Sequence, residues 1–151
     1  MAAQLADAIL FEGNKLDLYS NPLEEYWLKS KKKRPAFTTS EDCRRGYIAH
    51  WEIRDNQLLL TNVDGIISKR GLFGRKPVNC TMKMLFSKPG QNGVKADWFS
   101  GKLRIPKGNM TQYEHSGYNS RFEREMIITV DKGNILKIRT LDYTQKTLTV
   151  G

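Results

Sequence analysis

Cysteine and histidine are scarce in this chain. Its 151 residues include two of each, and the cysteines, Cys43 and Cys80, belong to no CxxC pair. Two cysteines are too few for a disulfide framework, which favours a reducing, cytoplasmic compartment. Whether Cys43 and Cys80 form a single bridge is left open by their positions in the sequence.

Long apolar runs are also missing. No segment approaches the roughly 20 apolar residues that cross a bilayer, and the N-terminal stretch has no basic leader but contains Asp7 and Glu12. We therefore expect a soluble protein with no membrane span. With 39% hydrophobic and 10% aromatic residues the chain has enough apolar surface for a core, and its length predicts one globular domain over residues 1–151.

Established catalytic and cofactor signatures are absent. The sequence contains no GxSxG nucleophile elbow, P-loop or dinucleotide fingerprint, and no histidine or cysteine pair at metal-ligand spacing. We expect neither a cofactor nor a metal, and enzymatic activity is the less favoured prediction. One alternative stays open, in which His50 and His115 act as general acid and base of a metal-free, ribonuclease-like hydrolase.

Acidic residues are missing from a long central segment. The net charge is +9, and between Gly65 and Ala96 seven basic residues occur without one acid. Such concentrated charge attracts nucleic acid, an anionic membrane or an acidic protein, although solvated loops have the same composition. The candidate nucleic-acid contacts in this segment and in the earlier basic run are Lys31, Lys32, Lys33, Arg34, Lys69, Arg70, Arg75 and Lys76.

Alternation of apolar and polar residues predicts a mainly β fold. The segment 47–53 places Tyr47, Ala49 and Trp51 on one face of a strand. Short, regularly spaced strands of this kind indicate an antiparallel sandwich or barrel. The other expected strands are 9–11 and 16–19 (a hairpin), 58–63, 78–86, 96–100, 102–105, 121–130 and 134–141, with turns at 64–65, 106–108 and 132–134 and exposed loops at 68–77 and 87–95.

One short helix is predicted near the N-terminus, at about residues 22–30. Asn21 has the position of an N-cap, Pro22 that of the first helical residue and Glu24 that of a capping-box glutamate. Pro35 disfavours helical backbone at the residue before it, so the helix should end near the basic run.

The segment 96–125 is unusually rich in aromatic, glycine and ionisable residues. In one interpretation it builds a ligand pocket from an aromatic platform and several directed polar groups. In the other, these are ordinary strand residues whose charges pair with one another. Strand patterning explains residues 113–118 least well. The candidate ligand-binding residues are Trp98, Arg104, Tyr113, His115, Tyr118, Arg121 and Glu125.

The stretches NPLEEYW, RGYIAHWEI, ADWFSGKLRIPKG and YEHSGYNSRFERE together resemble a recurring pattern in a family of uncharacterised bacterial proteins. The resemblance covers most of the chain and implies a shared fold, but nothing about catalysis. By analogy with other small basic domains, the favoured function is non-enzymatic binding of an acidic protein partner, as in immunity proteins of toxin systems. The alternative is nucleic-acid binding through the basic loops. The oligomeric state is left open.

Overall fold

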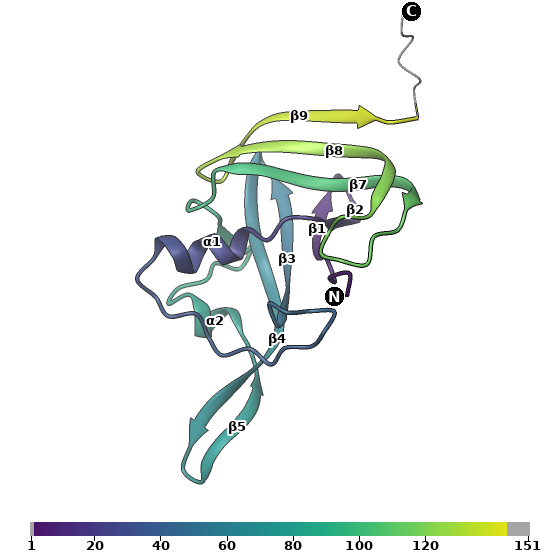
Figure 1. Ribbon diagram of the computed structural model, residues 1–151. Helices are drawn as coiled ribbons and strands as arrows, with labels where there is room; N and C mark the ends of the chain where they lie inside the picture. The colour runs from purple at the N-terminus through teal and green to yellow at the C-terminus, as the bar shows by residue number, and fades with distance from the viewer. Residues whose placement is uncertain (1, 145–151) are drawn as a thin grey trace, which may run out of the picture.

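A mixed β-sheet makes up most of the structure. The computed structural model describes residues 2–144, and within them nine strands and two helices follow one another as shown in Figure 1. The prediction of a mainly β chain with one short N-terminal helix is confirmed. The elements are β1 (Asp7–Phe11), β2 (Asn14–Leu18), α1 (Pro22–Lys29), β3 (Tyr47–Arg54), β4 (Gln57–Gly71), β5 (Gly74–Asn79), α2 (Met82–Leu85), β6 (Val94–Lys95), β7 (Gly101–Gln112), β8 (Arg121–Asp131) and β9 (Asn134–Asp142).

The sheet is mixed because one strand pair is parallel. Its order is β2-β1-β3-β4-β9-β8-β7, with β5 and β6 paired to β4 outside this path. All pairs are antiparallel except β1 and β3. A parallel pair needs a long connection, which β2, α1 and the loop up to residue 46 provide. The predicted antiparallel pairing thus holds for the named strand pairs of the described chain apart from this one.

The sheet curls so that its two ends approach each other. Figure 1 shows β7, β8 and β9 crossing over β3 and β4 at a steep angle. Next to the end of β2, the backbone N of Tyr19 donates to the carbonyl of Arg104 in β7 at 2.7 Å. No ladder joins β2 to β7 in the described part of the chain. The architecture is thus sandwich-like, and the barrel is not closed.

The core lies between these crossing layers. The predicted inward face of β3 is confirmed, since Tyr47, Ala49 and Trp51 are at most 1% exposed. Strand β7 contributes Leu103 and Ile105, which are fully buried. Because the inward residues come from strands far apart in sequence, one core packs strands near the start of the described chain against strands near its end.

Three hairpins of the described chain use the same tight turn, and one of them joins β3 to β4, with φ of 52° and 58° at Asp55 and Asn56. Glu12 and Gly13 have φ of 51° and 79° between β1 and β2, and Lys132 and Gly133 have φ of 47° and 80° between β8 and β9. Two consecutive positive φ angles define the type I′ turn, which matches the twist of paired strands. The predicted N-terminal hairpin and the predicted turn at 132–134 are confirmed.

Strand β4 is much longer than predicted. The expected turn at Asp64 and Gly65 is wrong, because β4 continues to Gly71 and residues 68–77, expected as a loop, belong mostly to the β4–β5 ladder. Gly65 forms no turn, and its missing side chain lets the ring of Phe37 pack closely against β4. A Cβ built on it would lie 2.9 Å from a ring carbon of Phe37.

Three further expectations are wrong. The predicted strand 78–86 is replaced by the end of β5 and the short helix α2. The predicted strand 96–100 is a turn, closed by the backbone N of Phe99 donating to Ala96 at 3.0 Å. The predicted turn 106–108 lies inside β7. Pro106 is tolerated there because β7 ends the sheet path, where a missing N–H breaks no ladder on the outer side.

Helix α1 begins at Pro22 as predicted, but its cap differs. The Asn21 side chain makes no capping hydrogen bond and instead donates to the Tyr118 hydroxyl at 2.9 Å. Glu24 accepts hydrogen bonds from Arg34 and Tyr47, so neither half of the expected capping box forms. Neither described helix has the length and apolar character needed to cross a membrane.

Candidate binding surfaces

A surface pocket opens where β7, β8 and the end of β9 meet. It has a volume of about 530 Å³, and three of its lining residues are the predicted ligand residues Arg104, Arg121 and Glu125. The ladder between β7 and β8 is irregular on both sides of Met110, so the two strands do not close over this region. The pocket follows from that irregularity.

A fixed polar wall lines one side of the pocket. The Nε of Arg104 donates to Oε1 of Glu125, and its Nη1 donates to the carbonyl of Tyr118 at 2.6 Å. The Tyr143 hydroxyl donates to the other oxygen of Glu125 at 3.0 Å. Partial burial and this hydrogen bond raise the pKa of Tyr143, so the phenol stays protonated. Glu125 is 8% exposed, and its charge is matched by Arg104.

Tyr118 supports this wall from behind. Its ring stacks on Tyr19 with centroids 4.8 Å apart, and its hydroxyl donates to the carbonyl of Leu5 at 3.1 Å. Burial raises the pKa of Tyr118. The guanidinium of Arg104 lies 5.4 Å from the centre of the Tyr19 ring. Tyr118 therefore positions Arg104 through its backbone and through the shared stack.

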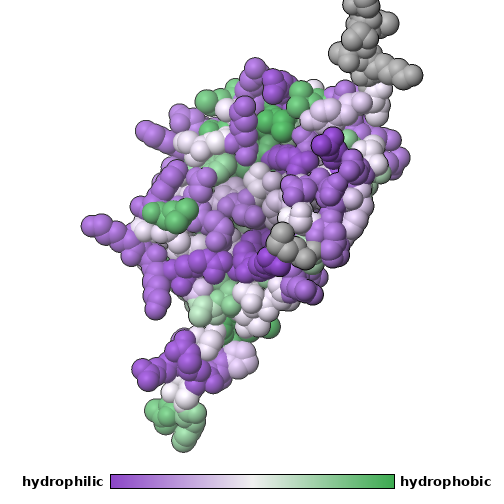
Figure 2. Space-filling model, in the orientation of Figure 1, coloured by the Kyte–Doolittle hydropathy of each residue, from purple (hydrophilic) through white to green (hydrophobic). Residues whose placement is uncertain are grey.

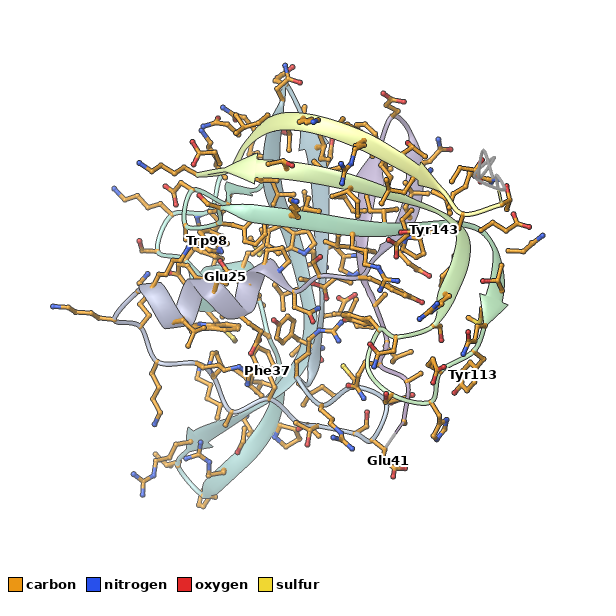
Figure 3. All side chains as sticks on the ribbon, turned by 45° about the horizontal axis from the view of Figure 1, so that its top comes forward. Glu25, Phe37, Glu41, Trp98, Tyr113 and Tyr143 are labelled. Carbon is orange, nitrogen blue, oxygen red and sulfur yellow. The ribbon has the colours of Figure 1, made fainter. Side chains whose placement is uncertain are left out.

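The other predicted ligand residues lie apart. Tyr113 and His115 occupy the loop after β7, where the Tyr113 hydroxyl and His115 Nδ1 are 2.8 Å apart on the exposed surface. Trp98 packs beside α1 and donates from Nε1 to the carbonyl of Pro22 at 2.9 Å. Figure 3 shows Trp98 at the opposite side of the molecule from Tyr113 and Tyr143. The structure therefore joins Arg104, Tyr118, Arg121 and Glu125, but Trp98 belongs to the core.

The two histidines have separate partners. His50 Nε2 lies 2.6 Å from Asp64 Oδ2 across the β3–β4 ladder, whereas His115 contacts Tyr113. No interaction between His50 and His115 is present in residues 2–144. Cys43 and Cys80 are both buried, free thiols, and burial raises the pKa of Cys80.

The second candidate surface is the distal β4–β5 hairpin, residues 66–79. Its ladder extends from the Ile66–Asn79 pair to the Gly71–Gly74 pair, and it places Lys69 opposite Lys76 and Arg70 opposite Arg75. Figure 1 shows the hairpin projecting from the body of the molecule. All four basic residues are exposed.

The tip of this hairpin is apolar. Leu72 and Phe73 are 94% and 99% exposed, and Figure 2 shows a hydrophobic end beyond a hydrophilic stem. Two adjacent, almost fully solvated large side chains flanked by four cations differ from the scattered apolar residues that normal surfaces carry. Such a tip has the character of a contact surface.

The residues that follow the earlier basic run lie at the base of the same hairpin. Phe37 bridges Ile67 of β4, and the backbone N of Ser68 donates to Ala36 at 3.3 Å. Lys31, Lys32 and Lys33 are exposed. Arg34 is instead engaged by a double hydrogen bond to Glu24, each at 3.2 Å. The structure thus connects the chain after the first basic run to the base of the hairpin, and it engages Arg34 with Glu24.

Several pocket residues were not predicted. Tyr143, Phe122, Thr111 and Gln112 line the pocket beside Arg104. No local pattern in the sequence distinguishes them, because their proximity depends on the β7–β8 irregularity and on the register of β9. The exposed pair Leu72–Phe73 did have a signal, since it is the only apolar pair between glycines and basic residues in the segment 69–76.

Comparisons of the chain with protein-family models, with curated proteins and with solved structures found no match, so no relative supplies a function.

Proposed function

We propose that this chain is a non-enzymatic binding protein that inserts its β4–β5 hairpin into an acidic protein partner. The observation that carries the proposal is the exposure of Leu72 and Phe73, at 94% and 99%, at the end of a hairpin with basic residues on both strands. A partner with an apolar pocket and an acidic rim is complementary to an apolar tip that has basic residues behind it.

The apolar tip supplies the favourable burial. Removing one large apolar side chain from water contributes about 1.5–3 kcal/mol, and aromatic side chains in central pockets are common binding hot spots. The ladder behind the tip holds both strands in place. This preorganisation lowers the conformational cost of association.

The charges behind the tip favour an acidic partner. Lys69 faces Lys76 and Arg70 faces Arg75 across the ladder, and like charges directly opposite each other destabilise a sheet. Arg75 is held by Ser68, with its Nε 2.9 Å from the hydroxyl and its Nη2 3.0 Å from the carbonyl. Carboxylates of a partner would relieve the repulsion and pair with these cations, of which Arg75 is already oriented.

The nucleic-acid alternative uses the same cations together with Lys31, Lys32 and Lys33. It explains the charge but gives the apolar tip no role in phosphate contact. The ribonuclease-like alternative needs His50 and His115 in one site, whereas the two residues have separate partners. Both observations support the choice of a protein partner.

The partner can be found by photo-crosslinking from the tip. Phe73 is replaced by p-benzoylphenylalanine in the source cells, and the crosslinked protein is identified, purified alone and titrated with the wild-type chain. We expect a stoichiometric complex, which F73A weakens at least tenfold, a loss of about 1.4 kcal/mol or more. The matched control is L28A on α1, because Leu28 is 83% exposed but lies outside the hairpin, and it should change affinity less than twofold.

Three outcomes would overturn the proposal. The first is that the crosslinked protein, once purified, forms no complex. The second is that L28A weakens the complex as much as F73A. The third is that a 30-bp DNA duplex, a 30-nucleotide RNA or phosphatidylserine vesicles bind the chain tightly and lose this affinity with F73A, which would assign the hairpin to one of those surfaces.

A further inference from the structure

We propose that the pocket between β7, β8 and the end of β9 binds a small organic monocarboxylate with a flat apolar body. The pocket is separate from the hairpin, which Figure 1 shows at the other end of the molecule. Its volume of about 530 Å³ lies within the range of small-molecule sites. The inference does not depend on the proposed protein partner.

One cation in the pocket is free. Arg121 is exposed, and within residues 2–144 its side chain has no hydrogen bond or ion pair. A guanidinium presents its donors in a planar fork that matches the two oxygens of a carboxylate. Arg121 therefore supplies the anchor for an acid group.

The other charged groups of the lining set the charge of the ligand. Arg104 is paired with Glu125, whose second oxygen accepts from Tyr143 at 3.0 Å. With Arg104 and Glu125 cancelling, Arg121 leaves the lining with a net charge of +1. A dianion would place its second charge near the Glu125 carboxylate without a second free cation. The pocket thus favours a single negative charge.

The remaining lining favours a flat apolar body with few polar groups. The half-buried ring of Phe122 lies beside Tyr19, with centroids 5.8 Å apart, and can pack against an aromatic ligand. Gln112 donates its amide to Glu114 at 2.7 Å, so its carbonyl oxygen is left to accept. The hydroxyl of Thr111, without a partner in the described residues, is a further polar group on the lining.

The probe for this site is benzoate, followed by amide chemical shifts in two-dimensional NMR of the full chain. We expect saturable shifts at Gln112, Arg121 and Phe122 with a dissociation constant of about 1 mM, given the small number of atoms in the ligand. Benzyl alcohol, which lacks the charge, and phenyl phosphate, which carries a second charge, should each bind at least fivefold more weakly.

Two charge-matched variants make the test specific. R121Q should weaken benzoate binding at least tenfold, whereas K137Q, which removes an exposed cation from β9, should leave it unchanged. Both variants should keep the wild-type pattern of core amide shifts, which reports folding. The proposal is overturned if benzoate produces no saturable shifts up to about 20 mM, if the shifts map outside the pocket, or if both variants weaken binding equally.

Discussion

Replacing Asp7 by asparagine is expected to lower the free energy of unfolding by about 3–5 kcal/mol. Asp7 is fully buried and accepts hydrogen bonds from Arg45 Nη2 at 2.8 Å, from the Ala49 backbone at 3.0 Å and from Trp51 Nε1 at 3.2 Å. The side chain of Arg45 is 8% exposed. D7N leaves this guanidinium buried without its counter-charge, and the loss should lower Tm by about 10 °C.

Urea unfolding of D7N and of E25Q measures this effect against a matched surface pair. Glu25 pairs with Lys29 at 3.3 Å, but both side chains are well exposed, so E25Q should change stability by less than about 0.5 kcal/mol. If the free energies of unfolding of D7N and E25Q differ by less than 1 kcal/mol, the buried Asp7–Arg45 pair does not hold β1 to β3 as the structure indicates.

The pH dependence of the stability of R45M tests the same ion pair by removing its cation. Burial raises the pKa of Asp7, and the charge of Arg45 and two N–H donors oppose the rise. Without Arg45 the folded-state pKa should rise further above the unfolded value. A group of this kind contributes stability that is present below the unfolded pKa and is lost as pH rises through the folded one. The loss in free energy of unfolding of R45M relative to wild type should therefore be smaller at pH 5 than at pH 8. Equal losses at the two pH values would contradict a role of Arg45 in keeping Asp7 charged.

Local patterns predicted the parts of the fold that local physics decides. The Tyr47–Trp51 alternation, helix α1 and the turn at Lys132 and Gly133 follow from periodicity, proline placement and glycine conformation. Gly65 shows where this reasoning fails. A glycine next to an aspartate is typical of a turn, yet this one makes room for Phe37, a neighbour 28 positions earlier. No local window contains that contact.

The candidate pocket also contains residues that local patterns can place and residues that they cannot. Arg104 and Glu125 lie on adjacent strands that the sequence predicted, so their pairing was within reach of pattern analysis. Trp98 was assigned to the pocket because it is close in sequence, but the turn 96–100 sends it under α1. Tyr143 was missed because its place beside Glu125 depends on how β9 returns along β8.

Replacing Gly133 by alanine is expected to destabilise the protein by about 2–4 kcal/mol, more than the same change at Gly13. Both glycines hold the second position of a type I′ turn, with φ of 80° and 79°. Alanine at either site incurs the left-handed backbone cost of about 1 kcal/mol. A Cβ at Gly13 would meet nothing within 4 Å, but at Gly133 it would lie 2.8 Å from the Ala96 carbonyl oxygen and 2.9 Å from the Ala96 carbonyl carbon.

That neighbour cannot move without breaking other contacts. The Gly133 carbonyl accepts from Leu58 at 2.8 Å and its N–H donates to Phe99 at 3.0 Å, while the Ala96 backbone N donates to Leu58 at 2.9 Å. Because backbone shifts of this kind add about 1–3 kcal/mol, G133A should lose that much beyond G13A in urea unfolding. Equal losses in the two variants would show that the β8–β9 turn is not pressed against the 96–99 turn, and that these two turns do not join the crossing layers of the sheet.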